Sequence, residues 1–479
     1  MSVTSKLALL LALTAALAAL VLHHATGING PDYWRWPWRL SFGLTPYFVL
    51  LVMALPAFLT TVKPLPPVIA IGLMMTTTLG IELANRAMDL QPYELTRVAT
   101  IIEEPGTTGY FTHAEEFIAR GKSVRQYLGD YVNLMPSLSL HARNKPPGSI
   151  LFYVPFLRLT DSENNAALAA GLFIALLATL SVPATYWLVM ELVQVRAAAQ
   201  AAAMCMCLTP GLVLFLPEFD QVYPAISCGL LAFWSCGLRT GKMRYAVAFG
   251  LLFALICFVT FNFLVLGVFV AGLAILHLLS PLPVLWERAR VRVSSFDQNL
   301  VTQEEGPHPN LLPEYREREN CLRNVAKQAG IILLAFLGFY LLLWLWSGYN
   351  PLHTLTTAIA NHQQDMPATH RTLPRTIPYD LLDFALGLGW IGALLAIYAA
   401  FNRRLEHRGL IWLALLQPVA VAISGLLQGE TARVWLFMAP IALLPAGMEL
   451  SLWGKRSRLA AYFCLWLLMA ILSQNMVFV

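Results

Sequence analysis

Long apolar runs separated by short polar turns dominate the chain. The first three runs cover residues of about 5–23, 44–62 and 68–86. A helix of about 20 apolar residues spans the roughly 30 Å hydrocarbon core of a bilayer, because it rises about 1.5 Å per residue. The runs therefore predict transmembrane helices. The first is expected to be retained, because no small-residue cleavage site follows it.

Apolar runs of this length continue towards the C-terminus. They cover about 165–192, 197–215, 221–238, 245–280 as two spans, 328–347, and four later stretches that end near Arg403, Leu427, Lys455 and the C-terminus. A shorter run at 149–159 is too short to cross unaided, and the pattern leaves open whether it crosses. The chain is thus predicted to be an all-α polytopic membrane protein with about 12–14 apolar segments.

Longer polar stretches divide these spans into blocks. The predicted blocks are membrane spans at 1–86, a loop at 87–148, spans at 149–280, a polar insertion at 281–326, and spans at 327–479 with a loop at 348–378. In the first loop, Phe117, Ile118, Val124, Tyr127 and Leu128 are spaced between charged residues. This pattern predicts helices that lie along the membrane interface.

The positions of Lys and Arg predict the orientation, because cytoplasmic turns carry an excess of these residues. Basic turns at Lys63, Arg239 and Arg403 place the N-terminus inside. The loops at 87–148 and 348–378 are then external, and the mixed-charge insertion at 281–326 is a cytoplasmic, partly disordered loop. The assignment holds only if 149–159 does not cross by itself.

Composition agrees with a membrane protein and excludes a soluble globule. Of 479 residues, 58% are hydrophobic and 12% charged, whereas soluble domains carry about 25% charged residues. The net charge of +5 is explained by basic residues flanking the spans and does not indicate binding to nucleic acid. The seven cysteines show neither metal-ligand spacing nor a disulfide framework.

Candidate chemistry begins with acids of the 87–148 loop. Glu103 and Glu104 precede a Pro-Gly turn, and a partly desolvated acid at a membrane surface can act as a general base. They could equally be helix-start acids favoured by the helix dipole. Asp89 and Glu82 are competing acids, since a carboxylate near the end of an apolar span is costly unless it is paired.

The same loop ends in a compact cationic group. His141, Arg143 and Lys145 lie beside the rigid corner Pro146-Pro147. A lysine is a good point-charge partner for phosphate, and the corner favours this interpretation over a lysine that snorkels from a helix end.

Further ionisable groups lie where spans end. Asp220, Glu430 and Arg433 are functional candidates for this reason, although Glu430 and Arg433 are three residues apart and could simply pair on a helix. The histidines of the 348–378 loop have no metal-ligand spacing and fit a hydrated loop.

Because charges at a membrane edge are costly, we expect the charged residues assigned to the outside to converge on one external cavity. Its predicted lining is Tyr110, Asp220, Glu430, Arg375 and His362.

Several motifs together resemble the integral-membrane glycosyltransferases of the GT-C superfamily. They are Gly109-Tyr110-Phe111-Thr112 with Ala114, then Asn144-Lys145-Pro146-Pro147 followed by Phe152-Tyr153, and Glu430-Thr-Ala-Arg433-Val-Trp435 leading to Pro440. The second motif is similar to the Lys-Pro-Pro signature of the aminoarabinose and protein-mannosyl transferases. The chain departs from that pattern by carrying Glu103-Glu104 where the family usually has Asp, and by placing three spans before the loop.

The resemblance implies a GT-C-like bundle and a reaction. Such enzymes pass a sugar from a polyprenyl-phosphate carrier to a lipid, glycan or protein acceptor at the external face, which implies a multi-pass protein of the bacterial cytoplasmic membrane. Carried over, Glu104 or Glu103 would be the base and Lys145 the phosphate contact, with His141, Arg143 and Arg433 assisting. No cofactor is implied with certainty, and a divalent cation is possible. The alternative is a secondary transporter or flippase, which predicts repeated halves with broken helices.

Overall fold

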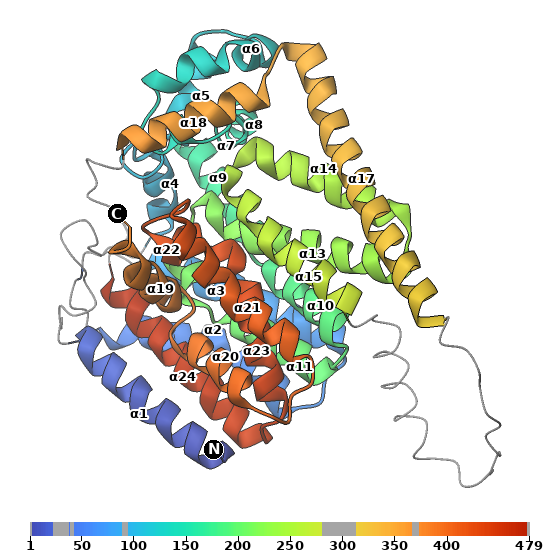
Figure 1. Ribbon diagram of the computed structural model, residues 1–479. Coiled ribbons are helices and arrows are strands. Elements are labelled where there is room, and N and C mark those ends of the chain that lie inside the picture. Colours follow the sequence, from blue (N-terminus) through green and yellow to red (C-terminus); the bar gives the residue numbers. More distant parts are fainter. Residues whose placement is uncertain are drawn as a thin grey trace.

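The structure is a computed structural model that describes residues 2–22, 38, 43–88, 94–279, 313–365 and 373–476. Within these ranges the chain forms helices, turns and one isolated bridge between Trp38 and Met476. Nine of the described helices are long and apolar enough to cross a membrane, or ten if one bent pair counts as a span. The predicted all-α polytopic fold is therefore confirmed (Figure 1).

The N-terminal spans begin and end within two residues of the predicted runs. They are α1 (Val3–Leu22), α2 (Leu44–Val62) and α3 (Pro67–Ala87). Lys6 of α1 forms a buried ion pair with Glu449, which also accepts hydrogen bonds from Asn402 Nδ2 at 2.7 Å and Trp453 Nε1 at 2.8 Å. These contacts fasten the first helix to the C-terminal part of the bundle.

We expect the Glu449→Ala substitution to destabilise the protein by about 3–5 kcal/mol, because it leaves the Lys6 ammonium buried without its counter-ion. Thermal unfolding of the purified protein in detergent would measure this effect. Glu406→Ala is a suitable control, since Glu406 is exposed in a turn close to Asn402 in the sequence. Equal unfolding temperatures for the two variants would contradict a stabilising role for the Lys6–Glu449 pair.

The first polar loop contains a set of short helices. These are α4 (Thr96–Glu103), α5 (Tyr110–Ala119), α6 (Val124–Leu134), η2 (Met135–Ser137) and η3 (Ala142–Asn144). As the alternation of apolar and charged residues predicts, Phe117, Tyr127 and Leu128 are buried. Ser123 begins α6 with a capping box to Gln126, which satisfies free backbone donors at the helix start.

The 149–159 segment does not cross the bundle. It forms α7 (Gly148–Leu151) and α8 (Val154–Leu159), which both pack against α5 of the loop. The basic turns on either side of it in sequence can therefore lie at one end of the molecule, as the orientation argument requires.

The central spans follow the predicted runs, with breaks inside them. They are α9 (Glu163–Ala178), α10 (Ser181–Val193), α11 (Arg196–Cys207), α12 (Pro210–Leu214), η4 (Phe219–Val222), α13 (Tyr223–Thr240), α14 (Met243–Val259), η5 (Phe261–Leu266) and α15 (Gly267–Leu279). The chain breaks at Thr260, between the two spans predicted at 245–280. The Thr260 hydroxyl accepts a hydrogen bond from the Asn262 N–H and so begins η5.

The C-terminal part holds the remaining helices. They are α17 (Pro313–Ser347), α18 (Pro351–Asp365), α19 (Thr376–Gly387), α20 (Ile391–Phe401), α21 (Arg408–Ser424), α22 (Thr431–Val434), η6 (Leu436–Met438), α23 (Ala439–Ser451) and α24 (Lys455–Asn475). The axes of α19 and α20 differ by 105°. The bend lies at Gly389 and Trp390, which both have positive φ.

Two predicted loops contain more helix than expected. The end of the 281–326 insertion belongs to α17, which begins at Pro313. Glu, Arg and Leu favour helix in this stretch. Glu319 also pairs with Arg323 one turn later. The 348–378 loop contains α18 and the start of α19. Residues 280–312 and 366–372, including His370, lie outside the described residues.

The spans alternate in direction, so the bundle has two chemically different ends. One, the basic end, holds turns rich in Lys and Arg: Lys63, Arg196, Arg239, Lys242, Arg244, Arg403, Arg404, Arg408, Lys455 and Arg456. The other, the loop end, holds α5, α6 and α18, far from the N-terminus (Figure 1). Arg86 at the end of α3 donates to the carbonyls of Leu214 and Leu216, which places the α12–η4 turn at the loop end too.

Candidate active site

Three distant segments bring five charged residues together at the loop end. Lys145 Nζ lies 4.0 Å from Asp220 Oδ1, and Arg433 Nε lies 3.8 Å from Asp220 Oδ2. Arg433 also faces Glu218 Oε2 at 3.7 Å and Glu430 Oε2 at 2.6 Å. We call Lys145, Glu218, Asp220, Glu430 and Arg433 the ionic cluster.

The cluster is largely shielded from solvent. The side chains of Arg433 and Glu218 are 4% and 5% exposed, and those of Asp220 and Lys145 are 10% and 17% exposed. Asp220 Oδ1 accepts no hydrogen bond from the described residues. Three of the four ion-pair distances, those of 3.7, 3.8 and 4.0 Å, exceed a direct hydrogen bond, so in these pairs the attraction is that of charge.

Lys145 is held in place from three sides. Its backbone is extended before the Pro146-Pro147 corner, its carbonyl accepts a hydrogen bond from the Tyr131 hydroxyl at 2.7 Å, and its Nζ donates to Thr260 Oγ1 at 3.2 Å. The ammonium also lies 5.9 Å from the centre of the Tyr223 ring, where a cation–π attraction operates. The lysine is therefore positioned rather than free to snorkel.

Helix α18 fixes the residues just before Lys145. The Asp365 carboxylate pairs with Arg143 and accepts a hydrogen bond from Asn144 Nδ2 at 3.1 Å. Asn361 Nδ2 donates to the Arg143 carbonyl at 3.0 Å. Arg143, predicted as a phosphate contact, is thus engaged by α18 and not by the acids of the ionic cluster.

The Arg433 turn is fixed by two buried acids of α19. Asp380 Oδ1 accepts from the Gly429 N–H at 2.9 Å, and Asp383 Oδ2 accepts from the Ala432 N–H at 2.8 Å. Glu430 begins α22 in a left-handed conformation with φ of 50°. The expected Glu430–Arg433 pair forms, and Arg433 reaches Glu218 and Asp220 as well.

Burial shifts proton affinities around the cluster. It raises the pKa of Glu218 to about 7, although Arg433 opposes the shift. It lowers the pKa of His141 to about 4, helped by Arg433, so this imidazole is neutral at pH 7. Burial also lowers the pKa of Lys145, while Asp220 raises it. Glu218 can therefore exchange a proton near neutral pH, as a general base must.

Glu103 and Glu104 have contacts outside the ionic cluster. Glu103 accepts a hydrogen bond from Asn164 Nδ2 at 3.4 Å, and the exposed Glu104 accepts one from the Gly106 N–H at 3.3 Å. Neither forms an ion pair with Lys145 or Arg433 in the part of the chain that the structure describes. Helix α4 ends at Glu103, and the following Pro-Gly turn leaves both acids near the surface.

Other predicted residues divide into two groups. Tyr110 and His141 lie close enough to feel the charges of Asp220 and Arg433. Arg375 is exposed before α19, and His362 is half-buried on α18. Among the described residues, the ion pairs of the cluster include neither of these two. Asp89 lies outside the described residues.

Sequence reasoning missed Glu218, Tyr223 and Thr260 as site residues. Glu218 is two residues before Asp220 in the same short turn. The prediction of Asp220 therefore already pointed to the turn that contains Glu218. Thr260 is not predicted, because nothing in its local sequence points to Lys145. Within the described ranges, no group of three or more His, Cys, Asp or Glu side chains is placed to hold a metal ion.

Comparison with known proteins finds a distant similarity to a solved structure. No protein-family model and no curated protein matches the chain. The structure is similar to the crystal structure of the Archaeoglobus fulgidus oligosaccharyltransferase in complex with zinc and sulfate, with 14% sequence identity and a TM-score of 0.42. The similarity covers 84% of this chain and 53% of the archaeal one, so the chain spans about half the length of that enzyme. A similarity of this degree assigns no activity to the chain.

Proposed function

We propose that the protein is a membrane glycosyltransferase that moves a sugar from a polyprenyl-phosphate carrier to an acceptor hydroxyl. The observation that carries this proposal is the meeting of Glu218, whose pKa is raised to about 7, with two buried cations, Lys145 and Arg433. Base and cations are the two requirements for displacing a phosphate from a sugar carbon.

In the proposed step, the acceptor oxygen forms a bond to the anomeric carbon of the sugar. The bond between that carbon and the phosphate oxygen breaks, and its electron pair goes to the phosphate. Glu218 takes the proton of the acceptor hydroxyl. Lys145 and Arg433 stabilise the charge that develops on the leaving phosphate, and Asp220 holds the two cations at a fixed spacing.

The surroundings of the cluster suit a lipid-linked donor. The cluster lies at the loop end of a bundle of apolar helices, where a phosphate can reach Lys145 while a polyprenyl tail stays in the bilayer. The excess of Lys and Arg at the opposite end favours a cytoplasmic position for that end. The cluster would then face the outside, the expected side for transfer to envelope lipids, glycans or proteins.

The function is tested with purified protein, a radiolabelled polyprenyl-phosphate sugar and a membrane lipid extract as acceptor. We expect time-dependent appearance of a labelled product other than free sugar. A parallel assay in proteoliposomes measures movement of the labelled lipid across the bilayer. Movement without transfer would overturn the proposal in favour of a flippase or transporter.

The orientation is tested by cysteine labelling. Arg125→Cys on α6 should react with a membrane-impermeant maleimide in intact cells, and Arg456→Cys at the basic end should react only after the membrane is permeabilised. Both residues are exposed. Six of the seven native cysteines are buried and Cys321 is half-buried, which keeps the background low. The reverse labelling pattern would contradict the external position of the cluster.

A further inference from the structure

Two acids of the ionic cluster, Glu218 and Asp220, come from one buried turn. This stretch, residues 214–220, joins α12 to η4, and we call it the acid turn. Arg433 faces its side chains, with Arg433 Nη1 3.7 Å from Glu218 Oε2 and Arg433 Nε 3.8 Å from Asp220 Oδ2. Both distances exceed a direct hydrogen bond, so these contacts do not by themselves fix the positions of the two acids.

A second arginine, Arg86 near the end of α3, holds the backbone of the acid turn. Its Nε donates to the Leu216 carbonyl, and its Nη2 donates to the Leu214 carbonyl. The carbonyl between them, that of Phe215, accepts from the Glu218 N–H at 2.7 Å. Three successive carbonyls are thus occupied, two of them by one guanidinium, and the third ties Glu218 to the same short stretch.

Burial makes the two Arg86 bonds important for the shape of the turn. Arg86 is 3% exposed, and Leu214, Phe215 and Leu216 are buried as well. A buried carbonyl that loses its donor is unfavourable. Arginine suits this position, because its planar guanidinium presents several N–H groups in fixed directions. Removal of the guanidinium would therefore force the acid turn to rearrange.

The separation of Glu218 from Arg433 matters for proton transfer. Burial raises the pKa of Glu218 to about 7, and Arg433 is the main charge that opposes this shift. Asp220 and Glu430 add to the increase, while Lys145 opposes it. At hydrogen-bonding distance Arg433 would favour the carboxylate much more strongly. Glu218 would then be ionised but too weak a base to take a proton efficiently near neutral pH.

We infer that Arg86 is a positioning residue, which fixes the backbone of the acid turn and so keeps Glu218 from closing onto Arg433. Its importance for catalysis rests on the proposed glycosyl transfer, whereas its control of the Glu218–Arg433 separation does not. Arg86 acts through the carbonyls of Leu214 and Leu216.

The test compares the purified full-length protein with Arg86→Met, which lacks both donors, and Arg86→Gln, which keeps one amide group. We expect Arg86→Met to slow single-turnover transfer about tenfold or more, because a displacement of about 1 Å can cost about 10²-fold. The ascending limb of its pH profile should move from about 7 to lower pH, because a direct pair with Arg433 lowers the pKa of Glu218. Arg86→Gln should show smaller changes of the same sign. Donor affinity should change little, since Lys145 is held by other segments.

Infrared titration of the same proteins gives a readout that needs no sugar transfer. The band of the protonated Glu218 carboxyl is identified as the one that is missing in Glu218→Gln. Its midpoint should fall in Arg86→Met. If the wild-type protein transfers no sugar while this midpoint still falls, the proposed function fails and the positioning role of Arg86 stands.

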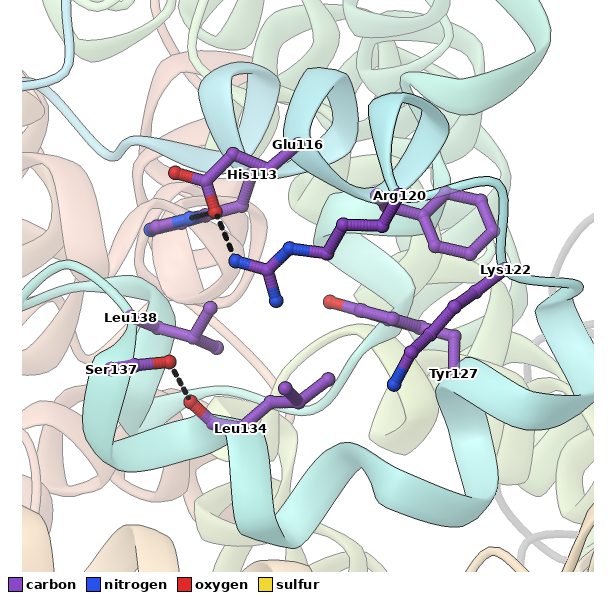
Figure 2. A pocket seen from close by; sticks show the side chains of 9 residues that line it. His113, Glu116, Arg120, Lys122, Tyr127, Leu134, Ser137 and Leu138 are labelled. Atoms are coloured by element: carbon purple, nitrogen blue, oxygen red, sulfur yellow. Dashed lines mark hydrogen bonds and ion pairs between the residues drawn. The ribbon is translucent and has the colours of Figure 1, made fainter.

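Two other arginines provide matched controls. Arg408 Nη2 also donates to a backbone carbonyl, that of Ala400 at 3.0 Å, but at the basic end. Arg120 lies at the loop end, where its Nη2 is 3.4 Å from Glu116 Oε2 in a small pocket whose lining includes no residue of the ionic cluster (Figure 2). Arg408→Met and Arg120→Met should leave the limb and the infrared midpoint where they are in the wild-type protein.

The pH readouts distinguish positioning from a merely structural role. A limb and a midpoint that stay at about 7 or rise in folded Arg86→Met overturn the inference, whatever the change in rate. Thermal unfolding shows whether each variant is folded. If Arg86→Met does not fold, the same criterion is applied to Arg86→Gln.

Discussion

Glu218→Gln is expected to lower the rate constant for sugar transfer by about 10²–10⁴-fold, the usual contribution of a positioned general base. Glutamine keeps the shape of the side chain and a carbonyl oxygen towards Arg433, which lies 3.7 Å from the carboxylate. It cannot take a proton from the acceptor. Single-turnover kinetics with a labelled lipid-phosphate sugar would measure the chemical step directly.

The pH profile gives a second readout of the same residue. Because the base must be ionised, transfer should rise as pH increases through about 7, the value to which burial raises the pKa of Glu218. This ascending limb should disappear in Glu218→Gln. Glu104→Gln is the matched control, since Glu104 is exposed and outside the cluster. Loss of activity in Glu104→Gln with full activity in Glu218→Gln would indicate that the general base is Glu104 of the 87–148 loop and not Glu218.

Lys145→Ala is expected to weaken binding of the donor about 10–100-fold, since a hydrogen bond to a charged group contributes about 1.5–3 kcal/mol. Lys145→Arg should restore only part of this affinity, because a planar fork replaces a compact ammonium that donates to Thr260 and lies near the Tyr223 ring. Equilibrium binding of the labelled donor would measure both variants.

Two controls make the Lys145 result interpretable. Lys122→Ala removes an ammonium from the loop without touching the ionic cluster. Thermal unfolding of Lys145→Ala shows whether the protein remains folded, which we expect because Asp220 keeps its contact with Arg433. A folded Lys145→Ala protein with unchanged donor affinity would contradict the phosphate role and leave Lys145 as an anchor of the loop.

The membrane spans were predictable from the sequence because each requirement for crossing a bilayer is local. The predicted 44–62 run is identical to α2, and the 68–86 run differs from α3 by one residue at each end. Helix α18 was missed because its sequence is polar, and polar helices are stabilised by contacts such as that of Asp365 with Arg143. Those contacts join residues that are far apart in the chain.

The candidate site was predictable only in part, for a similar reason. The high cost of charge at a membrane edge correctly suggested that Lys145, Asp220 and Arg433 lie together. The same argument could not separate Glu218 from Glu103 or Glu104, because all three are acids close to span ends. The turn after α4 leaves Glu103 and Glu104 near the surface, and the direction of a turn is not encoded in hydropathy.

The long separation of the cluster residues along the chain has a consequence for biosynthesis. Lys145, Glu218 and Asp220 leave the ribosome long before Arg433, yet Arg433 is the cation that contacts both acids. Until α22 has been made, two carboxylates at the membrane boundary have Lys145 as their nearest cation and must keep water around them. Insertion of the C-terminal helices thus supplies Arg433, the cation that pairs with both acids, and a chain that terminates early leaves Glu218 and Asp220 without it.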